Sequence, residues 1–179
     1  MFLLDDFSNY CFFPLYSISP IICKNQKKIC SFSYVPQMSE NERMHILSKD
    51  KDNISCNAIG KLKTMNDDVV MKQTEQCLDW LSHQSEADEQ RSGVTGFCMG
   101  GRFTFLANAQ LAGKFKGAAS FYGGGIGPIE DGAGRKVLLD RVAEIGAPIL
   151  FWYGSDDESI QPDELGRIAQ TMAEHKKQY

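Results

Sequence analysis

The sequence lacks several features that would assign a protein to a class from composition alone. Its 19 basic residues are outnumbered by 23 acidic ones, so no basic surplus indicates binding to nucleic acid or to an anionic membrane. No apolar run approaches the roughly 18 residues that a membrane span requires. The six cysteines contain no C-x-x-C pair, the usual element of a structural zinc site. We therefore expect no metal, no nucleic acid and no membrane among its partners.

A secretion signal is also lacking. The N-terminal stretch has some apolar residues, but it has no basic start and contains Asp5 and Asp6, which makes it a poor signal peptide. Without such a signal we do not expect the cysteines to form a disulfide framework. The expectation is a cytoplasmic protein with reduced cysteines.

Glycine is scarce in the first half of the chain and dense in the second. Of 16 glycines, only Gly60 lies among the first 92 residues, whereas twelve lie within residues 93–134. Residues 1–64 show no hydrophobic period and are interrupted by three prolines, among them Pro20. We predict that residues 1–64 are an unmatched, loosely attached extension and that residues 65–179 form an incomplete α/β domain. The alternative for the first segment is a divergent pair of strands added to the sheet of that domain.

Regular hydrophobic patterns begin after residue 65. Val70, Cys77, Leu78 and Leu81 share one face of a helix that starts near Asp67. Apolar and helical segments then alternate: we expect strands over 92–97, 117–122 and 148–153, and helices over 98–113, 135–145 and 162–177. About three strands and four helices in this order predict an α/β fold, a parallel sheet with flanking helices on both faces. The loops at the carboxyl ends of the strands are then the candidate binding region.

The loop after the first of these strands carries a cysteine between glycines, in the order Gly96, Phe97, Cys98, Met99, Gly100. A nucleophile on a sharp strand-to-helix turn needs small residues two positions before and after it, because strand and helix pass close together there. A helix N-terminus favours the thiolate of Cys98, and the backbone N–H of Met99 would point toward an oxyanion. The pattern predicts a nucleophile elbow; the alternative is a buried structural cysteine.

The loop after the third strand carries acidic residues at the same expected edge of the sheet. It reads Gly-Ser-Asp-Asp-Glu-Ser-Ile over residues 154–160. An acid at this place could orient a catalytic histidine and stabilise its imidazolium. We assign this role to Asp157, with Asp156 as the competitor and solvated turn acids as the alternative.

Two aromatic residues beside these loops, Tyr122 and Trp152, are candidate walls of a pocket, with core packing as the alternative. Glycines within residues 123–127 predict a flexible loop over the site. The sequence contains neither G-x-G-x-x-G nor the G-K-[ST] of a phosphate loop. A nucleotide-binding module is therefore disfavoured, and we expect no cofactor.

Residues 66–179 resemble the dienelactone hydrolase family of α/β-hydrolases. The resemblance is carried by GVTGFCMGGR around the cysteine, by FYG after the next strand, and by P-I-L-x-x-Y-G-x-x-D-x-x-I after the third. It implies an α/β-hydrolase-like fold with Cys98 as the nucleophile and Asp157 as the acid of a triad. It also implies a hydrolase that acts on a small molecule. The substrate would be a lactone or small carboxylic ester, cleaved through an acyl-thioester.

The same resemblance implies a triad histidine that follows the acid by one more helix and strand. Behind Asp157 the chain holds one helix and a single histidine, His175, within that helix. We name His175 only as a substitute base, since a surface residue near the helix end is the simpler interpretation. His83 and His45 are poorer candidates. The chain is therefore expected to be truncated.

Two hypotheses follow. The first is a hydrolase that uses Cys98, and the second is a truncated, catalytically inactive remnant that lacks the triad histidine. An incomplete parallel sheet would expose strand edges and apolar surface, so we expect the chain to associate with itself.

Overall fold

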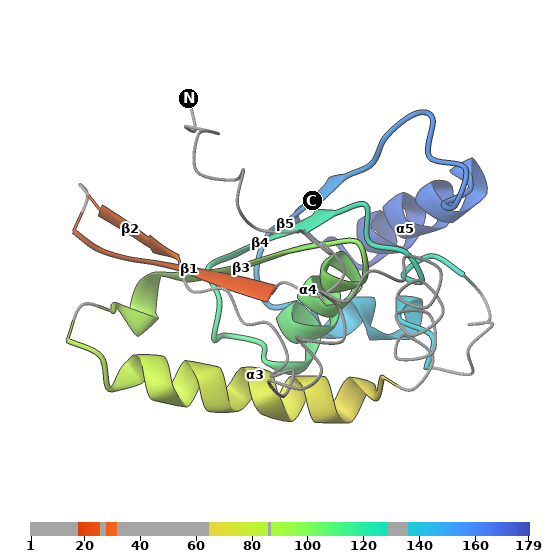
Figure 1. The fold of residues 1–179 in the computed structure, drawn as a ribbon. Coiled ribbons are helices and arrows are strands. Elements are labelled where there is room, and N and C mark those ends of the chain that lie inside the picture. Colours follow the sequence, from red (N-terminus) through yellow and green to blue (C-terminus); the bar gives the residue numbers. More distant parts are fainter. Residues whose placement is uncertain (1–17, 26–27, 32–64, 86, 129–135) are drawn as a thin grey trace, which may run out of the picture.

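The computed structural model describes residues 18–25, 28–31, 65–85, 87–128 and 136–179. Its strands form one five-stranded sheet in the order β2-β1-β3-β4-β5 (Figure 1). The strands are β1 (Ile18–Asn25), β2 (Lys28–Ser31), β3 (Ser92–Phe97), β4 (Gly117–Phe121) and β5 (Ile149–Trp152). The α-helices are α3 (Asp67–Ser82), α4 (Met99–Gln110) and α5 (Pro162–Glu174), and the 3₁₀-helices are η1 (Glu89–Arg91) and η2 (Leu139–Glu144).

Strands β3, β4 and β5 are parallel, as the alternation of apolar and helical segments predicted. Their last residues pair in one row, Phe97 with Phe121 and Phe121 with Trp152. The loops that leave these strands therefore start side by side at one edge of the sheet. This confirms the predicted α/β class, a parallel sheet with flanking helices.

Strands β1 and β2 lie within the segment that we predicted to be a loosely attached extension. β1 pairs antiparallel with β3 on one side and with β2 on the other, in agreement with the alternative of an added strand pair. Pro20 lies within β1 opposite Val94 of β3, and the described pairing of β1 with β2 starts at the next residue, Ile21. Residues 32–64 lie outside the described part, and the domain boundary after residue 64 stays a prediction.

Helix α3 has the predicted extent, with one change at its start. Asn66 is the N-cap: its side-chain oxygen accepts hydrogen bonds from the backbone N–H groups of Asp68 (2.8 Å) and Val69 (3.3 Å). The carboxylate of Asp67, near which we expected the helix to start, is directed to Arg102. The cap therefore leaves Asp67 available for a tertiary ion pair.

The helix predicted over residues 135–145 is wrong in type and length. The structure has the shorter 3₁₀-helix η2 there, and residues 129–135 lie outside the described part. Arg141 and Glu144 in η2 form an ion pair, with Nη2 and Oε2 2.5 Å apart. Three residues per turn place side chains at i and i+3 directly above one another, which suits this pair.

The core occupies one face of the sheet. Val94, Ala118 and Ile149 on that face pack with apolar residues of α3, α4, η2 and α5 in a single cluster. Leu150 and Trp152 point to the other face and are 50% and 61% exposed. The prediction of helices on both faces is therefore wrong for the described residues, whose helices cover one face.

Helix α4 packs directly on the covered face, and α3 lies on its outer side (Figure 1). Every residue of α4 from Met99 to Ala109 is buried, so this helix forms the centre of the core. Among the described residues, no helix combines the length and apolar character of a membrane span.

Candidate active site

Cys98 lies on a sharp turn between β3 and α4. Its backbone has φ 55° and ψ −121°, a region that residues with a side chain rarely adopt. Its N–H donates to the carbonyl oxygen of Phe121 on β4 (2.9 Å), and its own carbonyl accepts from Gly101 N–H (2.9 Å). These bonds anchor the turn to the neighbouring strand on one side and to the helix on the other. The thiol is half-buried and is not part of a disulfide.

Two pairs of glycines allow the strand, the helix and the next loop to approach. A Cβ on Gly96 would lie 2.2 Å from the carbonyl oxygen of Gly100, and a Cβ on Gly101 would lie 2.8 Å from Cα of Gly123. Real Cβ atoms essentially never come so close, so the elbow requires glycine at these places. Gly96 and Gly100 were singled out in the sequence, whereas the contact between Gly101 and Gly123 joins segments that sequence spacing does not relate.

The start of α4 sets the electrostatics around the thiol. Cys98 is the N-cap of α4 and Met99 is its first residue. The N-terminal end of a helix carries the positive end of the macrodipole, which stabilises a thiolate or an oxyanion nearby. Among the described residues, no cluster of three or more His, Cys, Asp or Glu side chains could hold a metal ion.

Tyr122 and Trp152 lie at the edge of the sheet where we expected them, and both side chains are exposed and not packed in the core. Tyr122 is 37% exposed, and its ring centroid lies 6.3 Å from that of Phe97. Partial burial raises the pKa of the Tyr122 phenol, and the neighbouring Cys98 raises it further. The ring of Trp152 stacks on Phe121 with a centroid distance of 5.9 Å. The aromatic side chains thus extend from β3 to β5.

The glycine-rich loop behind Tyr122 is tied down at its start. Gly123 is buried, and its carbonyl oxygen accepts a hydrogen bond from the hydroxyl of Tyr153 (3.2 Å). The hydroxyl of Ser120 donates to the carbonyl of Gly101 (3.0 Å) and links β4 to α4. The prediction of a flexible loop is therefore wrong for Gly123, because packing against α4 holds it.

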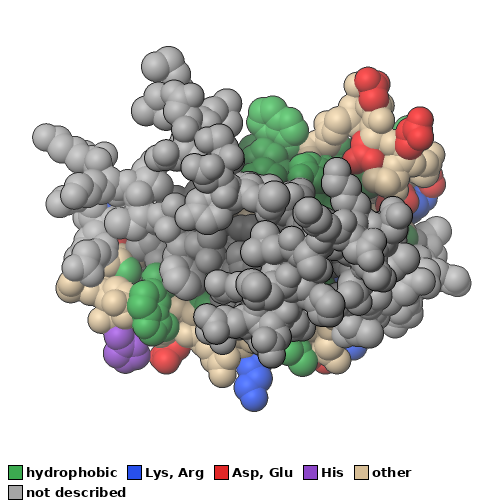
Figure 2. Space-filling view, viewed as in Figure 1, with side chains coloured by type: hydrophobic (Ala, Val, Ile, Leu, Met, Phe, Trp, Pro, Cys, Tyr) green, Lys and Arg blue, Asp and Glu red, His purple; other side chains and the backbone are tan. Residues whose placement is uncertain are grey.

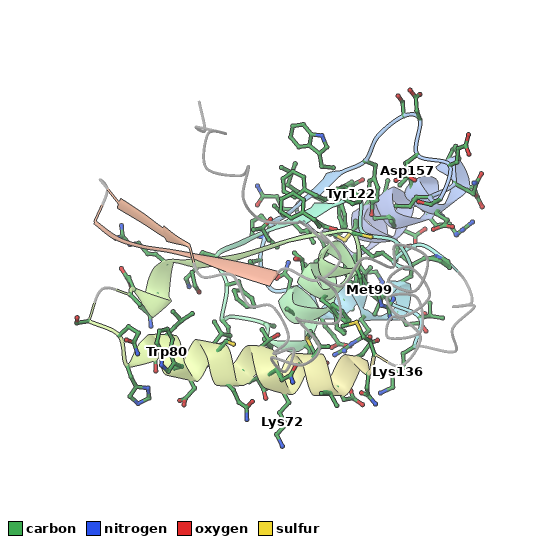
Figure 3. The ribbon with its side chains drawn as sticks, viewed as in Figure 1. Lys72, Trp80, Met99, Tyr122, Lys136 and Asp157 are labelled. Carbon is green, nitrogen blue, oxygen red and sulfur yellow. The ribbon has the colours of Figure 1, made fainter. Side chains whose placement is uncertain are left out.

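Asp157 lies in the loop between β5 and α5, at the same end of the sheet as Tyr122 (Figure 3). Its Oδ1 accepts hydrogen bonds from the backbone N–H (2.9 Å) and the hydroxyl (2.5 Å) of Ser159. These two bonds hold the pKa of the Asp157 carboxyl below its ordinary value. Asp156, the competitor, is exposed and accepts a bond from the hydroxyl of Ser155 (3.1 Å).

The structure does not bring the described histidines to Cys98. His175 is the C-cap of α5, and the carbonyl of nearby Gln178 accepts from the N–H of Ile149, the first residue of β5. His175 therefore lies near the amino end of the sheet, opposite the edge that carries Cys98. His83 is the exposed C-cap of α3, and its Nδ1 is 2.7 Å from the carbonyl oxygen of Asp79. His45 lies outside the described residues.

Arg102 is a residue of this region that sequence reasoning missed. Its side chain is fully buried, and Nη2 lies 2.8 Å from Oδ2 of Asp67 at the start of α3. The same guanidinium donates to the carbonyl oxygens of Gly125 and Lys136. Arg102 thus joins the elbow helix to α3 and to two points beyond β4. The signal in the sequence is one charged residue within a helix that carries no other charge. A charged side chain that is buried there requires a partner.

A parallel sheet with flanking helices and a strained strand-to-helix turn at Cys98 defines an α/β-hydrolase-like protein. The sequence matches the model of the Dienelactone hydrolase family over residues 27–179, and the chain belongs to this family. The match begins well before residue 65, so it includes part of the segment that we predicted to be unmatched.

Individual relatives agree with this assignment. A "Probable 2-oxo-3-(5-oxofuran-2-ylidene)propanoate lactonase" of Bradyrhizobium sp is 30% identical, over 66% of this chain and 47% of that protein. A "Putative carboxymethylenebutenolidase" of Methylorubrum extorquens is 26% identical, over 82% and 49%. The crystal structure of a "Putative Dienelactone Hydrolase" from Klebsiella pneumoniae superposes with a TM-score of 0.58 at 27% identity, over 65% and 47%. The chain spans about half the length of the relatives it matches.

Proposed function

We propose that this chain carries the nucleophile and the acid of a hydrolase that cleaves a lactone or small carboxylic ester through an acyl-thioester. The observation that carries the proposal is the backbone of Cys98, held at φ 55° between a parallel strand and the N-terminus of a buried helix. Such strain persists only where the surroundings enforce it, and it is concentrated at active sites. The relatives named as lactonase and carboxymethylenebutenolidase support the same substrate class.

The roles follow from position. Cys98 attacks the carbonyl carbon as a thiolate, and the backbone N–H of Met99 stabilises the oxyanion that forms beside it. Asp157 is the acid that would orient a histidine, because its loop follows β5 at the same edge of the sheet. The proton-accepting group is not assigned to His83 or His175, since both lie away from this edge.

The second candidate is a catalytically inactive remnant that lacks the triad histidine. It is favoured by the placement of the described histidines, each at a helix C-terminus away from Cys98. A triad that lacks one member retains only residual catalysis. We therefore expect this chain to hydrolyse activated esters weakly, and to do so through Cys98.

The test measures hydrolysis of p-nitrophenyl acetate and of a small lactone by the purified chain, by Cys98→Ala and by Cys77→Ala as the matched cysteine control. Weak hydrolysis that is lost in Cys98→Ala and retained in Cys77→Ala is expected. Efficient turnover that is lost in Cys98→Ala would contradict the remnant. Hydrolysis that survives Cys98→Ala unchanged would contradict the nucleophile.

We further propose that the chain acts in the cytoplasm and associates with itself through the sheet face that the described helices leave open, where Leu150 and Trp152 are exposed. Phe97, Phe121 and Trp152 form a stacked aromatic row on this face, next to small residues on β3 and β4. Figure 2 shows hydrophobic side chains exposed at this end of the molecule, beside the acidic residues of the neighbouring loop. Two copies that face each other would cover this apolar surface.

A further inference from the structure

Tyr122 occupies the same position after β4 that Cys98 occupies after β3. Both residues have positive φ, 39° for Tyr122 and 55° for Cys98, although neither is glycine. Phe97 pairs with Phe121, so the two residues leave the sheet side by side. A bulky side chain at positive φ is an outlier that calls for an explanation.

Packing around the next residue enforces this conformation. A Cβ on Gly123 would lie 2.6 Å from the hydroxyl oxygen of Ser120 and 2.7 Å from the carbonyl carbon of Gly101. The backbone N–H of Tyr122 donates to the carbonyl of Trp152 (2.7 Å). The backbone N–H of Tyr122 is therefore used within the sheet, and the phenol is the part of the residue whose role needs an explanation.

Core packing does not explain why a tyrosine stands here. The side chain is partly exposed and rests against the ring of Phe97, which is itself 39% exposed. Tyr122 follows Phe121 directly and Cys98 follows Phe97, so the pairing of these two phenylalanines places Tyr122 beside Cys98. A tyrosine with an ordinary pKa of about 10 is already protonated at neutral pH, and partial burial with the neighbouring Cys98 raises this pKa further, so the hydroxyl is a donor.

The order of the strands places Tyr122 between the two groups of the proposed site. Cys98 follows β3, Tyr122 follows β4, and Asp157 belongs to the loop after β5, and these three strands are neighbours in the sheet. Figure 3 shows Tyr122 and Asp157 at the same end of the sheet, with Met99 at the start of α4. In a catalytic triad the group that stands between nucleophile and acid is the one that gives a proton to the leaving group.

We propose that Tyr122 is a further catalytic residue, whose phenol gives its proton to the leaving oxygen of the ester; this rests on the proposed function of Cys98. The thiolate sulfur bonds to the carbonyl carbon, and the bond from that carbon to the leaving oxygen breaks with its electron pair on the oxygen. That oxygen takes the phenolic proton. A water molecule then returns a proton to Tyr122 as its oxygen attacks the thioester, which releases the acid and restores the thiolate.

The experiment compares the first turnover with two acetate esters that differ in leaving group. p-Nitrophenolate leaves without a proton, whereas the more basic phenolate of phenyl acetate benefits from a donor. Release of the phenol by the full chain, and the acetyl group on Cys98 detected by mass spectrometry, report acylation without requiring deacylation. Tyr122→Phe keeps the ring and removes only the hydroxyl, and Tyr179→Phe is the matched control, since Tyr179 bonds to Ala169 on α5.

We expect Tyr122→Phe to acylate with p-nitrophenyl acetate within about twofold of the unchanged chain and to be about tenfold slower or more with phenyl acetate. Tyr179→Phe should leave both rates unchanged. An equal loss with both esters would indicate a structural role and overturn the proposal, as would no loss with either. If neither ester acylates Cys98 in the unchanged chain, the proposed function fails as well, so the two failures are distinct.

Discussion

A Cβ atom on Gly96 would lie 2.2 Å from the carbonyl oxygen of Gly100. The two glycines stand two residues before and two after Cys98, one in β3 and one in α4, so strand and helix pass close to each other around the turn. The obstacle is a backbone atom and cannot rotate away as a side chain could. The spacing of glycines around the cysteine is thus a steric requirement of the turn itself.

Gly96→Ala should therefore destabilise the protein by about 3 kcal/mol or more, since strand and helix must separate to admit the methyl group. Gly117→Ala is the matched control: it also lies in a parallel strand, but a Cβ there meets nothing within 4 Å. We expect its free energy of unfolding to change by less than about 1 kcal/mol. Chemical denaturation measures both, and equal effects of the two substitutions would contradict the steric argument.

Cys98 and Cys77 should differ in their reaction with iodoacetamide. Burial raises the pKa of the Cys77 thiol, so Cys77 remains protonated and unreactive to higher pH than an ordinary cysteine. Cys98 lies on the strained turn at the N-terminus of α4, next to the backbone N–H groups of the first helical turn. At a pH of about 7.5 we expect Cys98 to be alkylated first, as measured by mass spectrometry of the labelled peptides. Faster labelling of Cys77 would contradict this account of the turn.

Removing the buried guanidinium of Arg102 should be costly. Arg102→Met leaves the carboxylate of Asp67 and two backbone carbonyls without this donor, and we expect a loss of about 3 to 5 kcal/mol in the free energy of unfolding. Arg91→Met is the control, since Arg91 pairs with Asp88 at the surface and should cost less than about 1 kcal/mol.

The partnership with Asp67 can be tested separately. The double variant Arg102→Met with Asp67→Asn should be less destabilised than the sum of its single variants, because the second change removes the unpaired carboxylate. Strict additivity would show that the ion pair does not couple α3 to the elbow helix.

The exposed aromatic row on the sheet face opposite the described helices predicts association in solution. The unchanged chain should sediment with a mass above the 20.0 kDa of one copy. Trp152→Ser, which removes the most exposed ring of the aromatic row, should shift the population toward the single copy. Val69→Ser on the outer surface of α3 removes a comparably exposed apolar side chain and should not. A monomeric unchanged chain would rule out this interface.

The carboxyl of Asp157 should titrate at lower pH than an ordinary aspartate, because Ser159 donates two hydrogen bonds to it. A depressed folded pKa means that these bonds stabilise the fold above the unfolded pKa of about 3.9 and lose that effect as the pH falls through the folded value. Ser159→Ala should raise the pKa of Asp157, as measured by NMR titration. Ser155→Ala, next to Asp156, should leave it unchanged.

The sequence predicted the parts of the fold whose cause lies within a short segment. The apolar runs over β3, β4 and β5 and the helical pattern of α3 are local, and each appears close to its predicted place. The helix predicted over residues 135–145 was wrong because the segment forms only the short 3₁₀-helix η2. The sequence of residues 129–135 before it shows no clear hydrophobic period. The choice of Asp157 over Asp156 came from the resemblance of the loop after β5 to the family segment, and its role stays a prediction.

The sequence alone therefore determined the elbow around Cys98, because glycine spacing, strand and helix start all depend on neighbouring residues. Only the tertiary structure decided the positive φ of Tyr122, the pairing of Arg102 with Asp67, and the one-sided core. Each of these depends on segments that are distant along the chain, here α4 against β4, α4 against α3, and the sheet against all the described helices. Such contacts arise from packing in three dimensions, and no residue pattern within one segment encodes them.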